Sequence, residues 1–200
     1  SDGARALTTD SDGSIYIAGY TSGDLDGETN NGIVDAFVSK YNSDGEKQWT
    51  RLIGSSQEDE ARGVTIGSDG SIYIAGDTEG DLDDQINSGN RDAFISKYNS
   101  DGEKQWTKLL GTPSWDSADV ISIGSDGSIY IAGDTEGDLD GQTNNGDQDA
   151  FISKYNSDGE KQWIRLIGSS QEDDARGVTI GSNGYIYIVG AARGDLDGQT

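Results

Sequence analysis

The sequence predicts an all-β protein, a β-propeller of four-stranded antiparallel blades with a 57-residue repeat. The segment "SDGSIYIAG" at 11–19 returns at 68–76 and 125–133, and as "SNGYIYIVG" at 182–190. Each unit contains two Asp-Gly turns between short apolar runs, and this dipeptide is the strongest local signal of a β-hairpin. No segment shows a helical period of useful length. Such a repeat is a supersecondary unit that must bury its faces against its neighbours.

Each repeat is expected to contain four strands, which the second copy illustrates. The first strand, 61–66, carries the smallest residues and suits the crowded position near the ring axis. The second strand, 71–76, alternates isoleucine with tyrosine and alanine. A long polar loop leads to the third strand, 92–98, and the fourth, 104–110, carries a tryptophan suited to the wide outer edge. Apolar residues on both sheet faces predict a propeller blade, and the tight hairpins disfavour the competing parallel β-helix.

These repeats place one partial propeller over 1–200, about three and a half blades long. Because a propeller buries its edge strands by closing into a ring, this number predicts either a homodimer or further blades outside these residues. The completed ring would hold about seven or eight blades. The expected blades are blade 1 at 4–53, blade 2 at 61–110, blade 3 at 118–167 and half of blade 4 at 175–190.

Charge dominates the composition. Fourteen Lys and Arg against 37 Asp and Glu give a formal net charge of −23, which argues against nucleic acid and anionic membrane surfaces as partners. No apolar run is long enough to insert into a membrane. The sequence contains neither Cys nor His, which excludes disulfides, thiolate nucleophiles and imidazole bases within these residues.

The pattern "DAFISKYNSDGEKQW…LIG…D.A.GV.IGSDGSIYIAG" resembles the bacterial SBBP-type β-propeller repeat, and more loosely the NHL-type blade. The resemblance covers the whole chain in about three and a half copies. It implies a propeller of four-stranded blades. Because the family consists mostly of surface and secreted proteins, it also implies an extracellular or cell-surface location.

One face of the propeller is expected to carry the long loops. In an antiparallel blade, the loop that enters strand one and the loop that joins strands two and three leave at the same end. In the second copy these loops are 54–60 and 76–91, and both are polar and acidic. Long loops on a rigid scaffold are where binding usually occurs, so we expect any binding site on this acidic loop face.

A twelve-residue window in the longer loop suggests calcium. It recurs in three copies, with alternate carboxylates, amides and glycines, and calcium needs six to eight oxygen ligands. Glycine falls at the fourth position of the window and strands flank it, so any site would differ from the helix–loop–helix kind. The competing interpretation is that these residues cap turns through their own backbone. The predicted metal ligands are Asp24, Asp26, Asp35, Asp81, Asp83, Asp92, Asp138, Asp140, Asn144 and Asp149.

Trp115 and Asp116 are the predicted ligand contacts. Trp115 lies in the loop before the third blade, where the other copies have glutamate. An indole beside carboxylates is a candidate for stacking on a ligand. Asp116 belongs to a set that recurs just before each first strand, and the alternative for this set is a structural acceptor for backbone N–H groups.

A non-enzymatic binding or scaffold module is the predicted function, with calcium as its one candidate cofactor. Near-identical blades give a quasi-symmetric face, whereas catalysis needs unlike groups that converge on one point. Its partner would be a protein or a glycan, and a lectin-like, glycan-binding propeller is the alternative function. A glycosidase or lyase that uses paired carboxylates is the least supported class.

Overall fold

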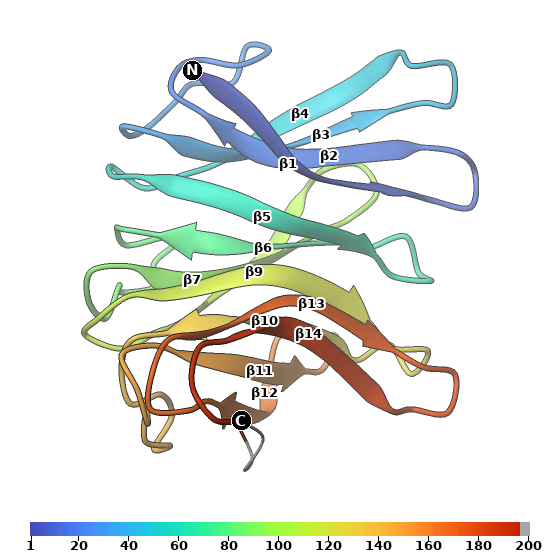
Figure 1. The fold of residues 1–200 in the computed structure, drawn as a ribbon. Coiled ribbons are helices and arrows are strands. Elements are labelled where there is room, and N and C mark those ends of the chain that lie inside the picture. The colour runs from blue at the N-terminus through green and yellow to red at the C-terminus, as the bar shows by residue number, and fades with distance from the viewer. Residues whose placement is uncertain (197–200) are drawn as a thin grey trace.

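The computed structural model describes residues 1–196 and has the predicted all-β fold (Figure 1). Fourteen strands and no helix occur in these residues, so none of them forms a helix that could cross a membrane. The strands begin and end close to the predicted positions. They are β1 (Asp2–Thr9), β2 (Ile15–Thr21), β3 (Asp35–Tyr41), β4 (Lys47–Ile53), β5 (Asp59–Ile66), β6 (Ile72–Thr78), β7 (Asp92–Tyr98), β8 (Lys104–Leu110), β9 (Asp116–Ile123), β10 (Ile129–Thr135), β11 (Asp149–Tyr155), β12 (Lys161–Ile167), β13 (Asp173–Ile180) and β14 (Ile186–Ala192).

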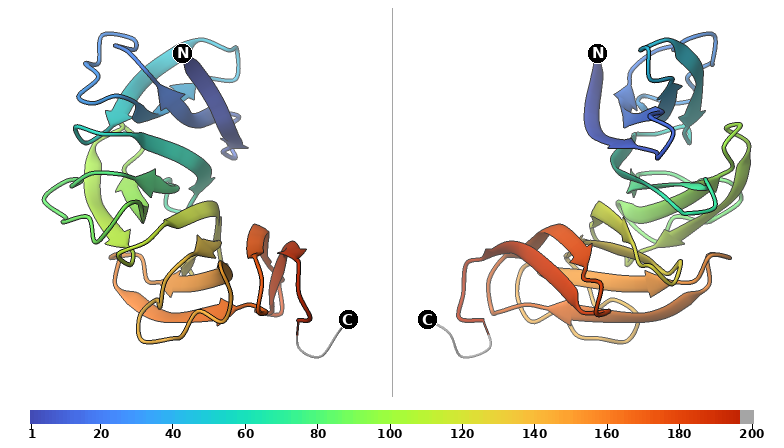
Figure 2. Two further views of the ribbon diagram at one scale, coloured as in Figure 1. Left: turned by 60° about the vertical axis from the view of Figure 1, so that its left-hand side comes forward. Right: turned by 90° about the vertical axis from the view of Figure 1, so that its right-hand side faces the viewer.

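Three complete blades and half of a fourth make up the molecule. The four-stranded sheets have the orders β1-β2-β3-β4, β5-β6-β7-β8 and β9-β10-β11-β12, and β13 pairs with β14 alone. The first strands β1, β5, β9 and β13 contact one another in turn, so they form the inner side. Figure 2 shows the blades around an arc whose two ends lie apart. The structure is therefore an open, partial propeller.

A bulge interrupts each first strand at the same place. In blade 2 the register shifts between Ala61 and Gly63, which leaves Arg62 without a partner on β6. Gly76 lies opposite this point, and a Cβ atom there would lie 1.9 Å from the carbonyl oxygen of Glu60, so only glycine fits. Bulges re-aim side chains and are frequent next to functional sites. The bulged residues of the four blades are Arg5, Arg62, Asp119 and Arg176.

Neighbouring blades pack through two unlike faces. We name the face that carries Tyr16 and Ala18 in blade 1 the tyrosine face, and the face that carries Ile72, Ile74 and Phe94 in blade 2 the isoleucine face. The tyrosine face of blade 1 and the isoleucine face of blade 2 form one buried cluster. Equivalent residues form the clusters between blades 2 and 3 and between blade 3 and the half-blade. The core therefore lies between the blades.

The tryptophans of the fourth strands pack between blades, as predicted. The ring of Trp49 lies 6.2 Å from that of Tyr16 and borders the cluster between blades 1 and 2. On its other side it faces the turn of the next blade, where a Cβ atom added to Gly102 would lie 3.0 Å from the indole. Trp106 repeats both contacts with Tyr73 and Gly159.

The long loop after each second strand folds back along the outer strand of its own blade. In blade 2 its tip forms an ion pair between Asp83 and Lys104, and Thr107 Oγ1 donates a hydrogen bond to Asp83. In blade 3 Gln142 pairs with the backbone of β12 at Ile164 and Leu166. These contacts cover the outer strand, whose edge would otherwise remain unpaired.

A buried leucine anchors the folded loop in blades 2 and 3, Leu82 and Leu139 respectively. Leu82 is 1% exposed and belongs to the cluster between blades 1 and 2, whereas Ile86 in the same loop is 80% exposed. We expect Leu82→Ala to lower the free energy of unfolding by about 2–4 kcal/mol, because it leaves a cavity between two blades. The matched variant Ile86→Ala should change it by less than about 0.5 kcal/mol. Urea unfolding followed by circular dichroism measures both, and equal effects would show that the loop is not anchored by Leu82.

Candidate functional site

The two sets of long loops meet at the junctions between blades. Short parallel bridges join Val34 to Glu58, Arg91 to Trp115, and Gln148 to Glu172. Each bridge links the end of a blade's longer loop to the loop that enters the next blade. The loops therefore leave at one common face, as predicted, and we call this end of the molecule the loop face.

The structure does not gather the predicted calcium ligands around one point. Asp26 lies at the tip of a two-residue turn with Gly27, where both residues have positive φ, and it pairs with Lys47. Asp24 instead accepts the backbone N–H of Asn30, and the buried Asp35 accepts the N–H groups of Asn31 and Gly32. Within residues 1–196 no three acidic side chains lie close enough together to hold a metal ion. The equivalent residues Asp81, Asp83, Asp92, Asp138, Asp140 and Asp149 have the same kinds of partner, and Asn144 bonds to Thr135 and Gly146.

Asp116 is a structural acceptor and not an exposed contact. It is 1% exposed, its Oδ2 accepts hydrogen bonds from the N–H and hydroxyl of Thr112, and its Oδ1 accepts one from Thr135. Burial raises its pKa above the usual range. Asp59 has the same role in blade 2, where burial raises the pKa to about 6. Of the two predicted ligand contacts, Trp115 alone lies on the surface.

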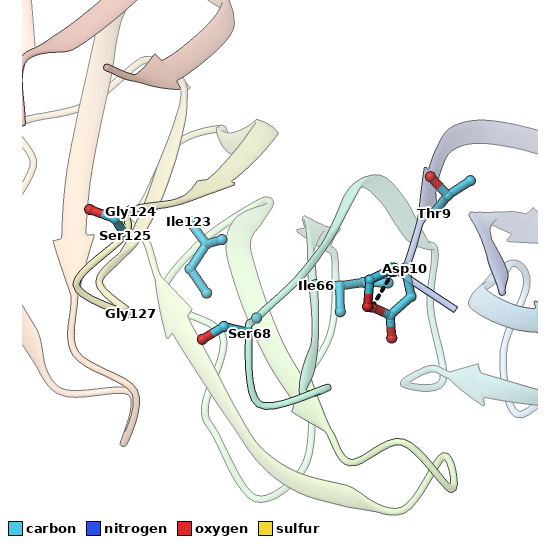
Figure 3. Close-up of a pocket in the computed structure, with 10 residues that line it drawn as sticks. Thr9, Asp10, Ile66, Ser68, Ile123, Gly124, Ser125 and Gly127 are labelled. Carbon is cyan, nitrogen blue, oxygen red and sulfur yellow. Dashed lines mark hydrogen bonds between the residues drawn. The ribbon is translucent and has the colours of Figure 1, made fainter. Parts of the chain in front are cut away.

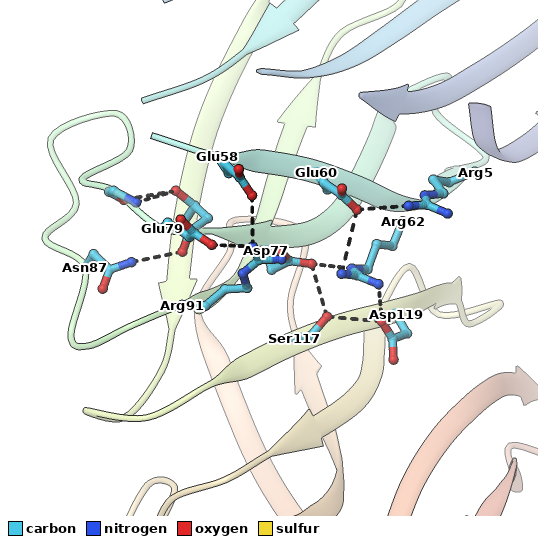
Figure 4. A network of polar contacts seen from close by, with 12 residues as sticks. Arg5, Glu58, Glu60, Arg62, Asp77, Glu79, Asn87, Arg91, Ser117 and Asp119 are labelled. Atoms are coloured by element: carbon cyan, nitrogen blue, oxygen red, sulfur yellow. Dashed lines mark hydrogen bonds and ion pairs between the residues drawn. The ribbon is translucent and has the colours of Figure 1, made fainter. Parts of the chain in front are cut away.

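Trp115 packs against a charged cluster on the loop face, and Figure 4 shows the charged and polar members of this cluster. The residue is 45% exposed, and the guanidinium of Arg91 lies 4.5 Å from the centroid of its ring. The buried Arg91 bonds to Asp77 at 2.6 Å and also pairs with Glu79. Glu58, 3.5 Å from Arg91, leaves much of its side chain exposed. The indole is therefore held against a rigid, ion-paired base.

The cluster continues across the inner strands to three blades. Asp77, which is fully buried, also pairs with Arg62 and accepts a hydrogen bond from Ser117 at 3.2 Å. Arg62, the bulged residue of β5, lies 3.5 Å from Asp119, the bulged residue of β9. Arg5 in blade 1 joins through Glu60. We call this set the rim cluster: Arg5, Glu58, Glu60, Arg62, Asp77, Glu79, Arg91, Trp115, Ser117 and Asp119.

Asp134, which lies next to Asp119 at the end of the rim cluster, titrates near neutral pH. Burial and the neighbouring Asp119 charge raise the pKa of Asp134 to about 7. Burial also raises the pKa of Asp119, and Arg62 opposes this effect. The pair therefore holds a proton more strongly than exposed carboxyl groups do.

Sequence reasoning missed most of the rim cluster, although a signal was present. Along the 57-residue repeat, Arg62 is replaced by Asp119, and Glu58 by Trp115. The apolar and turn positions of the same strands recur almost unchanged. The cluster thus gathers the positions at which the repeat diverges, and divergence within a repeat was the available signal.

A hollow at the opposite end is a weaker candidate (Figure 3). It has a volume of about 490 Å³ and lies among the turns that join β1 to β2, β5 to β6, and β9 to β10. Asp10 is the one charged side chain in its lining, beside serines and turn glycines. Because binding sites need several convergent polar groups, the rim cluster is the better candidate.

The match to a family model agrees with the fold. Residues 1–26, 48–83 and 162–197 match the SBBP family model, described as a beta-propeller repeat. The regulatory protein FlaEY of Caulobacter vibrioides is 29% identical over 208 aligned positions, which cover 94% of this chain and 22% of that protein. The chain thus spans about a fifth of that relative's length. A crystal structure of a protein of unknown function from Bacteroides caccae matches with a TM-score of 0.48 at 12% identity, covering 94% of this chain and 53% of that one.

Because burial raises the pKa values of Asp59 and Asp134, we expect the free energy of unfolding to fall as the pH rises. A folded-state pKa above the unfolded value contributes stability at low pH that is lost as the pH passes the folded pKa. For Asp59 this loss falls between about pH 4 and 6 and amounts to about 3 kcal/mol, and for Asp134 the loss extends to about pH 7. We expect Asp59→Asn to flatten the pH dependence of the urea midpoint in this range, because asparagine keeps an acceptor for Ser55. A variant that keeps the wild-type slope would contradict this assignment.

Calcium binding by the long loops, which the sequence suggested, would require the observed loop contacts to rearrange. A bound ion would have to break the pair between Asp26 and Lys47 and its equivalents, and draw Asp35 away from two backbone N–H groups. We therefore expect calcium to leave the melting temperature unchanged at constant ionic strength. Differential scanning calorimetry with calcium, and with magnesium as control, measures this. A rise in melting temperature that is specific to calcium, and that Asp26→Asn removes, would instead show that the long loops bind calcium.

Proposed function

Because the chain carries SBBP β-propeller repeats, we propose that it is a non-enzymatic binding and scaffold module that recognises a cationic segment of a partner protein. The recognition site is the part of the rim cluster around Trp115. We also propose that it acts outside the cell or at the cell surface, which is supported by its resemblance to a family rich in surface and secreted proteins.

The exposed indole of Trp115 is the observation that carries this proposal. One side of the ring stacks on Arg91, and 45% of the residue remains exposed to solvent. Backbone bonds fix its position, because its carbonyl accepts the N–H of Glu136 and the next residue donates to the carbonyl of Arg91. A fixed, exposed aromatic ring is a low-entropy contact for a partner's cation or apolar stem.

Carboxylates around the indole favour positive ligands. Glu58 has a side chain that is 42% exposed, and Glu136 is exposed beside the same loop. The net charge of −23 adds a long-range field that accelerates the approach of basic partners. Arg91 and Arg62 do not cancel this field locally, since each is already paired with two or more carboxylates.

We propose a non-enzymatic role because the charged side chains of the rim cluster are occupied in bonds to one another. Within the described residues, the arginines and acids of the rim cluster are bonded mostly to one another, which suits a rigid recognition surface. The name of the similar regulatory protein from Caulobacter vibrioides is compatible with action through binding. A glycan is the second candidate ligand, because an exposed tryptophan beside carboxylates also suits stacking on a sugar ring.

Titration with a lysine- and arginine-rich peptide tests the proposal. The informative variant is Trp115→Glu, because Glu58 and Glu172 occupy the equivalent position at the other two junctions and the local fold accepts glutamate there. Loss of the indole contact should weaken peptide binding about tenfold by calorimetry, although the variant is more acidic. The matched control Glu172→Gln removes one charge at a different junction and should change affinity by less than about threefold.

Two outcomes would contradict the proposal. Equal peptide affinity for the wild type and Trp115→Glu would show that only the diffuse negative charge attracts the peptide. Binding of neutral oligosaccharides on a glycan array that is lost in Trp115→Glu, without peptide binding, would favour the glycan instead.

A further inference from the structure

A continuous row of residues crosses the loop face, just beyond the ends of the strands. The N–H of Glu79 donates a hydrogen bond to the carbonyl of Glu58. The N–H of Glu136 donates the equivalent bond to the carbonyl of Trp115, and a parallel bridge joins Trp115 to Arg91. Equivalent positions of two successive repeats therefore lie side by side: Glu58, Glu79 and Arg91 from blade 2, and Trp115, Glu136 and Gln148 from blade 3.

Blade 2 already holds a guanidinium group in this row (Figure 4). The Nη1 atom of Arg91 lies 2.6 Å from the carboxylate of the fully buried Asp77. Its Nη2 atom pairs with Glu79 and lies 3.5 Å from Glu58. Asp77 lies near the end of β6, Glu79 lies just beyond that strand, and Glu58 lies in the loop that enters β5. The blade thus shows how this fold holds an arginine side chain, with two close carboxylates and a third beside them.

Blade 3 keeps the two close acids but lacks the arginine. Along the 57-residue repeat, Asp134 and Glu136 occupy the positions of the two acids closest to the guanidinium of blade 2, whereas the uncharged Gln148 takes the position of Arg91. Within residues 1–196 neither Asp134 nor Glu136 forms an ion pair, although both acids of blade 2 do. Asp134 instead neighbours Asp119, which adds a second negative charge. Blade 3 therefore has carboxylate acceptors for a cation that the chain itself does not supply.

The indole of Trp115 takes the position of the third acid. It lies in the row between Arg91 and Glu136, and the guanidinium of Arg91 already stacks on it at 4.5 Å from the ring centroid. Because 45% of the residue is exposed, the ring has surface left for a second planar cation. Glu172, the next acid along the row, pairs with Arg193 at 2.6 Å and is therefore occupied. Two carboxylates and one aromatic ring bound the site.

We propose that blade 3 binds an arginine side chain of the partner protein at the position that Arg91 occupies in blade 2. The incoming guanidinium pairs with Glu136 and Asp134 and stacks on Trp115. This inference rests on the function proposed above and narrows its ligand from a cationic segment to one that contains arginine. A planar guanidinium bonds two carboxylates at once and stacks on an aromatic ring, whereas the ammonium of lysine is a compact point charge. The site should therefore prefer arginine to lysine.

Isothermal titration calorimetry with two peptides of equal length and charge tests this preference. One peptide carries arginines and the other carries lysines at the same positions, and the pH is 8, above the Asp134 pKa of about 7. We expect the wild type to bind the arginine peptide about tenfold more tightly than the lysine peptide.

The informative variant is Gln148→Arg, because it rebuilds the arrangement of blade 2 and fills the site from within. It should reduce the preference for arginine to less than about threefold. The matched control is Gln162→Arg, which adds the same charge at an exposed position of β12, beside the turn at the opposite end of the blade. This control should keep the wild-type preference. A second variant, Glu136→Gln, removes one carboxylate without filling the site and should also reduce the preference. Glu136 is exposed, so this variant should keep the wild-type circular dichroism spectrum.

Two results would overturn the arginine site: equal affinity of the wild type for both peptides, or a preference for arginine that survives in Gln148→Arg and Glu136→Gln. The variant Trp115→Glu separates this failure from failure of the proposed function. If both peptides bind the wild type equally and Trp115→Glu weakens both, recognition of a cationic segment stands without a site for arginine. If neither peptide binds the wild type, both proposals fail.

Discussion

The packing of one blade's tyrosine face onto the next blade's isoleucine face is the interaction on which the rest of the structure depends. A single four-stranded sheet has no core of its own, and the apolar residues become buried only between sheets. Tyr16, Tyr73 and Tyr130 are almost fully buried there, while a lysine of the third strand lies over each of these rings at 5.3–5.4 Å. This requirement explains why apolar positions recur so strictly along the repeat.

The acidity of the chain is used in two different ways. In the long loops, carboxylates accept backbone N–H groups and pair with lysines of the fourth strand, which holds each loop against the outer edge of its blade. At the blade corners, aspartates such as Asp59 and Asp116 are buried and stabilise the turn into the first strand. The remaining exposed carboxylates provide the negative field. A high density of acidic residues is therefore mostly structural here and does not by itself indicate a metal site.

The rim cluster arises where the repeat is least regular. A bulge in each first strand turns one side chain out of the ladder, and this residue is arginine in blades 1 and 2 but aspartate in blade 3. Arg62 can therefore pair with Asp119, where a strict repeat would oppose two arginines. Trp115 replaces a glutamate at the same junction and stacks on Arg91. The asymmetry gives this quasi-symmetric face one junction that is chemically distinct.

By itself the sequence determined the strands, the hairpins, the blade order and the common face of the long loops, because these follow from short-range turn chemistry and from the strict period of the apolar residues. It also identified Trp115 as an unusual residue. It did not show that Asp26 lies at a turn tip paired with Lys47, or that Asp77 joins Arg62 to Arg91. Those arrangements depend on the loop folding back and on the stacking of separate blades. Only the tertiary structure decided them, because the partners are far apart in the chain and meet through packing that no local pattern encodes.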